Sequence, residues 1–188
     1  MADLPEVFDS QALASLSEAE KALMEWGVPY EKKQDGTLFV PRNLNISSKG
    51  LTRLPDMSSV SISGGFSCFN NQLTSLEGAP QTVGGVFSCD DNQLTSLKGA
   101  PQTVGGVFCC SNNQLTSLEG APDTCQTLFT DFGEFSSWDA VPENLRLSPE
   151  TAARIKQEKQ AQAETAVRNA VVLQAPVAIK SPLRFRQR

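Results

Sequence analysis

The 188-residue sequence contains no histidine, one tyrosine and two tryptophans, although it has ten phenylalanines. Without histidine, the chain lacks a Ser-His-Asp triad, a Cys-His pair and any metal site that needs an imidazole ligand. It also lacks a glycine-rich phosphate loop that follows a strand and opens a helix. We therefore expect a protein that is not an enzyme and that uses neither a cofactor nor a bound metal.

Long apolar runs are absent as well, because no stretch approaches the 18 apolar residues of a transmembrane helix. The acidic N-terminus has no apolar core of the kind found in a secretory signal peptide. Five cysteines are an odd number in a chain without such a signal, which is typical of reduced thiols. We expect a protein of a cytoplasm-like compartment that has no membrane partner.

Positive charge is scarce except near the C-terminus. The formal net charge is −5 and the isoelectric point is about 4.8. Residues 1–42 have eight acidic and four basic side chains, residues 43–135 have eight and three, and residues 136–188 have five and nine. A nucleic-acid-binding protein usually has a basic surface. An acidic body with a basic end therefore favours a protein partner over a nucleic acid.

An internal repeat of 21 residues dominates the middle of the chain. The segment from Asn71 to Cys89 and the segment from Asn92 to Cys110 differ at two positions, and a third copy opens at Asn113. A degenerate copy from Leu44 to Pro55 precedes them at an offset of 22. Repeats of this length predict a stack of structural units, here about five rungs.

Alternation within the repeat predicts one strand per rung. Phe87 and Cys89 alternate with Val86, Ser88 and Asp90, which is the pattern of a strand with one buried face. Stacking the rungs predicts a parallel sheet whose internal columns are Phe66, Phe87, Phe108 and Phe129, and Cys68, Cys89 and Cys110. A third column, Asn71, Asn92 and Asn113, is expected to bond backbone groups where each strand ends. The Gly-Ala-Pro and Val-Gly-Gly stretches are expected at corners.

The signature Phe-x-Cys-x-x-Asn-x-Leu-x-x-Leu resembles the leucine-rich repeat pattern, with Phe and Cys in two of the aliphatic positions. The Leu-Thr-Ser-Leu stretch followed by proline is similar to short bacterial and bacteriophage leucine-rich repeat proteins. This resemblance implies a solenoid that binds proteins. It also implies a bacterial cytoplasm or a phage particle as the setting.

The expected fold class is thus an α/β repeat: a leucine-rich repeat-like β-solenoid with a parallel sheet on one face, helical caps and an extended tail. A capping box at Ser17, a stop at Gly27 and a hairpin turn at Asp35-Gly36 define an N-terminal cap. Ser148 and Pro149 start a second helix. The predicted regions are an N-terminal cap (1–42), the solenoid (43–135), a C-terminal cap with helix (136–175) and an extended basic tail (176–188).

The strand side chains that point away from the core are the predicted partner-binding surface, because solenoids bind partners on the concave sheet face. The position after the core cysteine varies between copies that are otherwise nearly identical, and the face is mostly uncharged. The predicted contact residues are Phe69, Val86, Ser88, Asp90, Val107, Cys109, Ser111, Thr130 and Phe132. A second contact is predicted from the tail residues Lys180, Arg184, Phe185, Arg186 and Arg188.

Three alternatives accompany this interpretation. The chain could be a structural subunit of a larger assembly such as a virion, anchored by the C-terminal helix and tail. It could be an inhibitor or effector whose acidic body blocks a host enzyme or defence complex. Cys109, which occupies an outward position, could be a reactive thiol, whereas the column of Cys68, Cys89 and Cys110 is expected to be a buried filler of the core.

Overall fold

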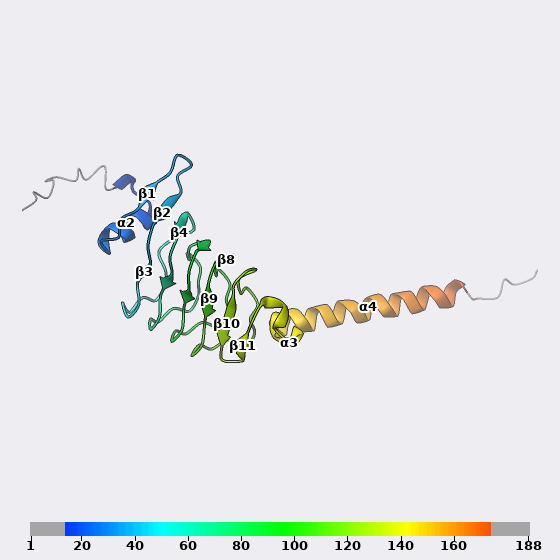
Figure 1. Cartoon of the computed structure of the whole chain (residues 1–188). Helices are drawn as coiled ribbons and strands as arrows, with labels where there is room; N and C mark the ends of the chain where they lie inside the picture. The colour runs from blue at the N-terminus through cyan, green and yellow to red at the C-terminus, as the bar shows by residue number, and fades with distance from the viewer. Residues whose placement is uncertain (1–13, 174–188) are drawn as a thin grey trace, which may run out of the picture. The chain divides into compact units, whose positions relative to one another are not determined.

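The computed structural model describes residues 14–173, with side chains to residue 165. The predicted tail contacts, Lys180 to Arg188, therefore lie outside the described residues. The chain divides into two compact units, Met1–Ser148 and Pro149–Arg188. The second unit contains one long helix, α4 (Pro149–Leu173), which begins at the predicted proline (Figure 1).

The first unit is a β-solenoid, as the repeat predicts (Figure 1). One side is a six-stranded sheet in the order β11-β10-β9-β7-β5-β3. The strands β3, β5, β7, β9 and β10 are parallel, and one turn of the solenoid separates each strand from the next. Strand β11 pairs with β10 in the antiparallel direction. The strands are β3 (Leu44–Asn45), β5 (Phe66–Ser67), β7 (Phe87–Ser88), β9 (Val107–Cys109), β10 (Thr127–Thr130) and β11 (Gly133–Phe135).

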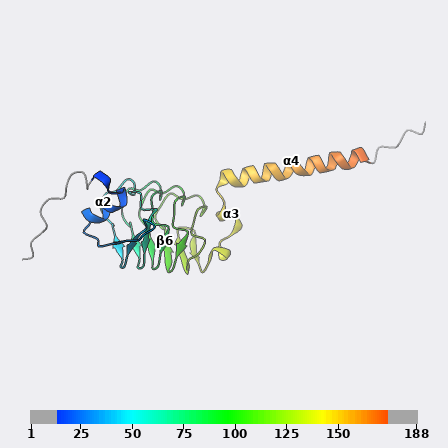
Figure 2. The same cartoon turned by 90° about the horizontal axis from the view of Figure 1, so that it is seen from above.

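A second sheet, which the repeat pattern does not predict, forms another side of the solenoid. Its order is β1-β2-β4-β6-β8. Thr82 and Val83 form strand β6, although the repeat suggests a corner at this point. Viewed from above, strands of successive rungs lie side by side in a row (Figure 2). The strands are β1 (Glu31–Lys32), β2 (Leu38–Val40), β4 (Val60–Ile62), β6 (Thr82–Val83) and β8 (Thr103–Val104).

Identical residues stack in columns inside the solenoid. The rings of Phe66, Phe87 and Phe108 are fully buried, and their centroids are 5.3 Å apart in each neighbouring pair. Such a spacing suits offset stacking of aromatic rings between adjacent strands. Cys68 and Cys89 are fully buried beside them. The predicted phenylalanine and cysteine columns are thus confirmed for the three central rungs.

The predicted asparagine column is confirmed in detail. Asn92 donates from Nδ2 to the carbonyls of Cys68, Cys89 and Asp90, each at 3.1 Å. Its Oδ1 accepts the backbone N–H of Leu73 at 3.0 Å. One buried amide therefore satisfies backbone groups of two successive rungs at the point where the strand ends. Asn71 and Asn113 make the equivalent bonds in their rungs.

The two glycine stretches turn the chain for different reasons. Gly99 has a φ of +86°, a conformation that glycine adopts without strain. Gly105 has no such φ, and instead a Cβ there would collide with the carbonyl of Gly84 in the neighbouring rung. The Val-Gly-Gly stretch is therefore required by close backbone approach and not by a left-handed conformation.

The last turn of the solenoid is one residue shorter than the repeat. Leu128, not Phe129, pairs with Phe108 across the sheet, and Leu128 is fully buried. A shift of one residue turns every side chain of a strand to the other face. Phe129 consequently points outward with 39% of its surface exposed, so its predicted place in the internal column is wrong.

The N-terminal cap agrees with the prediction. Ser17 accepts the backbone N–H of Glu20, and the Glu20 side chain accepts that of Ser17, which completes the capping box of α2 (Glu18–Glu25). Gly27, with a φ of +65°, follows the helix. Strands β1 and β2 form the expected antiparallel hairpin, which leads into the second sheet.

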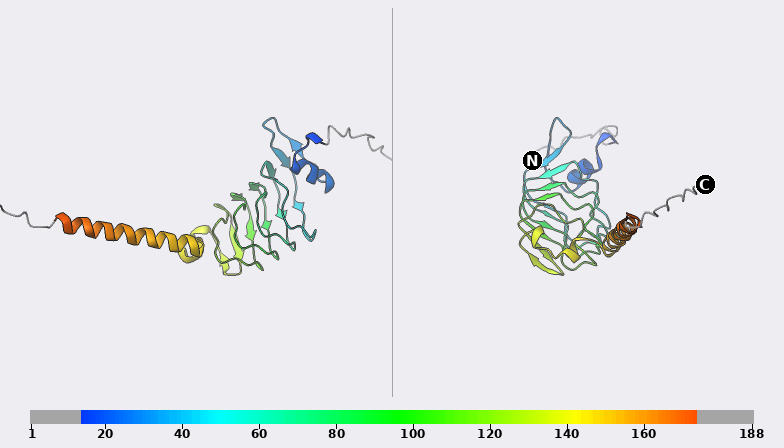
Figure 3. Two further views of the ribbon diagram at one scale, coloured as in Figure 1. Left: turned by 180° about the vertical axis from the view of Figure 1, so that it is seen from behind. Right: turned by 90° about the vertical axis from the view of Figure 1, so that its right-hand side faces the viewer.

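The C-terminal end of the first unit differs from the prediction in part. Phe135 and Trp138, the latter in the short 3₁₀ helix η1 (Trp138–Ala140), pack against the core. The sequence also predicts that Phe129 and Phe132 join these two residues in an aromatic cluster over the last coil. This prediction is wrong, since both phenylalanines are more than a third exposed. Views from behind and from the side show the hairpin β10–β11 as the end of the stack (Figure 3). Helix α3 (Glu143–Arg146) follows.

We predict that Asn92→Ala lowers the free energy of unfolding by about 3 kcal/mol, because it removes the partner of four buried backbone groups. Urea denaturation followed by circular dichroism measures this change. Gln93→Ala is the control, since Gln93 is exposed and a surface substitution changes stability by about 0.5 kcal/mol or less. Equal stability of the two variants would contradict a structural role of the asparagine column.

We also predict that Leu128→Asp lowers the thermal midpoint by roughly 10 °C, because it places a charge in the core. Phe129→Asp is the matched variant, and it should change the midpoint by only about 1 or 2 °C since the side chain faces solvent. A strict 21-residue register predicts the reverse order of the two variants. Differential scanning fluorimetry distinguishes the two registers.

Candidate functional site

The outward side of the six-stranded sheet, here called the strand face, is the candidate site. Exposure alternates along each strand, so that Val86 is exposed, Phe87 is buried and Ser88 is half-buried. The parallel register then aligns outward residues of neighbouring strands in rows. The strand face consists of Ser67, Phe69, Val86, Ser88, Asp90, Val107, Cys109, Ser111, Thr127, Phe129, Asp131 and Glu134.

Most of the predicted contact residues lie on this face. Phe69, Val86, Ser88, Asp90, Val107, Cys109 and Ser111 all do so. Thr130 does not, because it is buried and its hydroxyl donates to the carbonyl of Gly133 at 2.9 Å. Phe132 lies in the turn between β10 and β11, beside the face and not on it. Both corrections follow from the last turn of the solenoid, which is one residue shorter than the repeat and so moves each later residue to the other face of the strand.

The residue that sequence reasoning missed is Phe129. In the structure it pairs with Cys109 on the neighbouring strand and points to the same side. The signal in the sequence is that the third copy replaces Val-Gly-Gly by Cys125-Gln126, one residue fewer before its strand. Because Phe129 directly follows Leu128, a phenylalanine still stands 21 residues after Phe108 and the period appears intact.

Four side chains form a continuous apolar stripe on the strand face: Val86, Val107, Cys109 and Phe129. Val86 neighbours Val107 across β7 and β9, and Cys109 neighbours Phe129 across β9 and β10. Val86 is 46% exposed, the largest fraction among the exposed large apolar residues of the described chain. A hollow of about 280 Å³ adjoins Val86 where Gly65 provides no side chain.

Three carboxylates border the apolar stripe and form an acidic rim: Asp90 and Asp131 follow β7 and β10 at the strand ends, and Glu134 lies on β11. Asp90 accepts the Ser88 hydroxyl and the backbone N–H of Ser111, both at 2.8 Å. Asp131 accepts the backbone N–H groups of Asn112 at 2.7 Å and Asn113 at 3.2 Å. These bonds hold the two carboxylates in fixed positions. Glu134 is exposed and pairs with Phe129 across the hairpin.

Basic residues are nearly absent from this part of the chain. Residues 54–145 include ten acidic side chains and a single basic one, Lys98. Lys98 lies in the loop after β7 and pairs with Glu77 at 3.4 Å, away from the strand face. The acidic rim therefore has no compensating positive charge among the residues of the strand face. A groove or stripe lined by charge of one sign attracts ligands of the opposite sign.

The cysteine thiols are poorly suited to chemistry. All five cysteines are free, and the thiols of Cys68 and Cys89 donate to carbonyls of the next rung. Burial raises the pKa of the Cys68 thiol to about 12. Burial, with a smaller effect of the Asp90 charge, raises the pKa of Cys109 to about 11. Since the thiolate is the nucleophile, both thiols are in the unreactive form at neutral pH.

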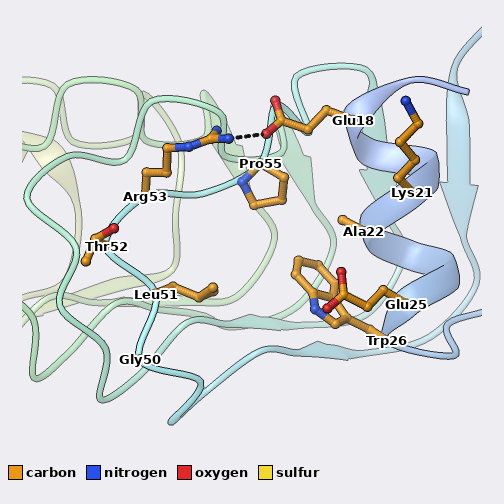
Figure 4. Close-up of a pocket in the computed structure, with 10 residues that line it drawn as sticks. All are labelled: Glu18, Lys21, Ala22, Glu25, Trp26, Gly50, Leu51, Thr52, Arg53 and Pro55. Carbon is orange, nitrogen blue, oxygen red and sulfur yellow. Dashed lines mark ion pairs between the residues drawn. The ribbon is translucent and has the colours of Figure 1, made fainter. Parts of the chain in front are cut away.

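A second hollow, of about 410 Å³, lies between α2 and the first rung (Figure 4). Trp26 and Leu51 point toward each other across it, and both pack against the core. At its rim, Arg53 pairs with Glu18 at 2.7 Å, and this hydrogen-bonded contact lowers the pKa of the Glu18 carboxyl. Because Arg53 and Glu18 already neutralise each other, we interpret this hollow as the seam between cap and solenoid.

Two further features of the described residues concern metal sites and membrane-spanning helices. Within the described chain, no three His, Cys, Asp or Glu side chains gather in a group that could hold a metal ion. None of the helices over residues 14–173 has the length and apolar character that crossing a bilayer requires.

Comparison with known proteins gave no match among protein-family models, curated proteins or solved structures.

We predict that alkylation of Cys109 by iodoacetamide becomes about tenfold faster per pH unit from pH 7 and is still accelerating at pH 10. An ordinary thiol, with a pKa of about 8.5, stops accelerating before that point. Cys109→Ser is the control, and mass spectrometry locates the modified cysteine. A rate that levels off near pH 8 to 9 would show an activated or ordinary thiol and would contradict the high pKa.

Proposed function

We propose that this chain is a non-enzymatic protein-binding module and that its partner binds the strand face. The observation that supports this proposal is the apolar stripe, which leaves Val86 and Phe129 exposed on an otherwise regular sheet. Contiguous exposed apolar side chains with a polar rim are typical of interaction sites. The bacterial or phage setting implied by the repeat is part of the same proposal.

The rigidity of the strand face also supports binding. Hydrogen bonds between side chains fix its polar residues, as in the pairs Ser47–Ser67 at 2.7 Å and Ser88–Asp90 at 2.8 Å. Asparagines behind the sheet fix the strand ends. A partner would therefore meet side chains that are already ordered, and less conformational entropy would be lost on binding.

The area of the strand face is too small to form a standard protein interface by itself. Five strands at about 4.8 Å give a sheet about 20 Å wide, and the five positions from Val86 to Asp90 in each rung give about 17 Å of length. The resulting area of roughly 350 Å² is below the roughly 800 Å² that each partner contributes to a standard interface. We propose that the interface extends over the β10–β11 turn, where Phe132 is exposed.

A structural subunit of a larger assembly is the second candidate function. The observation that favours it is α4, a 25-residue helix in a unit of its own. Its side chains are exposed at nearly every described position. A long polar helix of this kind contributes little to the stability of an isolated monomer. In an assembly it would have a neighbour to pack against.

We predict that the double variant Val86→Asp/Phe129→Asp loses its partner in a pull-down from native lysate, with recovery reduced at least tenfold. Mass spectrometry with quantification identifies the partner and measures its recovery. Thr82→Asp/Thr103→Asp is the matched control, because both threonines are exposed on the other sheet. That variant should retain the partner.

A variant that lacks residues 174–188 is compared with these variants in the same pull-down. Loss of the partner with the deletion alone would contradict binding at the strand face and would make the solenoid a spacer. Recovery of only the chain itself in large particles, unaffected by the face variant, would favour the structural subunit.

A further inference from the structure

The acidic rim and the apolar stripe together define what kind of polypeptide the strand face fits. The inference rests on the proposed function and adds the chemistry of the partner. We infer that the strand face binds an extended segment of a partner protein in which apolar or aromatic residues alternate with arginine or lysine.

Charge is the first reason. Asp90 and Asp131 border the apolar stripe at the strand ends and Glu134 borders it on β11, and no basic side chain belongs to the strand face. Asp90 and Asp131 each accept two hydrogen bonds from their own chain, one per oxygen. An ionised carboxylate has about four acceptor sites, so each can accept further bonds from a guanidinium group. Among the described residues, no hydrogen bond or ion pair occupies Glu134.

The dimensions of the apolar stripe are the second reason. From Val86 to Phe129 it crosses two strand spacings, about 10 Å, and moves two residues along the strands, about 7 Å. Its diagonal of about 12 Å equals roughly four residues of extended chain. Alternate side chains of an extended segment point to the same side and recur about every 7 Å. Two or three of them would therefore cover the apolar stripe.

The shape of the face fits the same occupant. One apolar side chain of the segment would enter the hollow beside Val86, which Ser67 and Gly65 help to line. Another would lie against Phe129. The intervening residues would project sideways, and long arginine or lysine side chains reach a rim carboxylate while their aliphatic stems cover apolar surface. A polyanion does not fit, because the rim carboxylates would repel it.

The test is a fluorescence anisotropy titration with a labelled eight-residue peptide that alternates leucine or phenylalanine with arginine. We expect the full chain to bind it, and we expect Phe129→Ser/Glu134→Lys to weaken binding at least tenfold. Asp123→Lys is the matched control, because it makes the same charge change at an exposed position outside the strand face. It should weaken binding less than threefold. Thermal unfolding of each variant verifies that it is folded.

Two further peptides separate the contribution of charge to binding from that of the apolar side chains. A peptide with serine in place of every apolar residue keeps the charge, and one with glutamate in place of arginine keeps the apolar residues. Both should bind at least tenfold more weakly, and raising the salt from 50 to 500 mM should weaken the parent peptide because exposed charges are screened. Because the chain contains its own basic residues after position 173, a variant with glutamine at Lys180, Arg184, Arg186 and Arg188 is titrated in parallel.

Equal binding of the serine peptide, or unchanged binding by Phe129→Ser/Glu134→Lys, would overturn the inference. The proposed function would stand if the pull-down partner is still lost with Val86→Asp/Phe129→Asp. It would fail separately if that partner is retained.

Discussion

The rest of this structure depends on the hydrogen bonds that Asn71, Asn92 and Asn113 make to the carbonyls of two successive rungs. Asn92 connects the rung of Cys68 to the rung of Cys89, and Asn113 repeats the connection one rung later. Because these bonds fix where each strand ends, they also fix its register against the neighbouring strand. The stacking of Phe66, Phe87 and Phe108 at 5.3 Å then follows from the register and does not need to be imposed separately.

The same register determines the outer surface. Once Phe87 and Cys89 point inward, Val86, Ser88 and Asp90 must point outward, since strand side chains alternate. Rows of outward residues therefore become rows of neighbours, and the apolar stripe is one consequence. The acidic rim is partly structural in origin, because Asp90 and Asp131 bond backbone N–H groups at the strand ends. The negative charge of the strand face thus arises in part from the residues that hold the strand ends.

Much of this arrangement could be predicted from periodicity. The 21-residue repeat gave the solenoid, the buried columns and the asparagine bonds, and the capping box gave α2. Periodicity failed at the last turn, where the shortened corner at Cys125-Gln126 moves Leu128 into the core and turns Phe129 outward. It also failed for Thr82-Val83, because the adjacent Gly84-Gly85 pair favoured a corner at this point. Phe129, a main residue of the candidate site, was missed for the first of these reasons.

By itself, the sequence determined that identical units stack, which side chains fill the three central rungs and where the N-terminal cap begins. These features are local or repeat in every unit, so a single copy contains their cause. The tertiary structure alone decided which way the last strand faces, that a second sheet forms and that Val86, Val107, Cys109 and Phe129 lie together. Each of these depends on backbone pairing between rungs about 20 residues apart, and a one-residue change there reverses which side chains of the strand face the core.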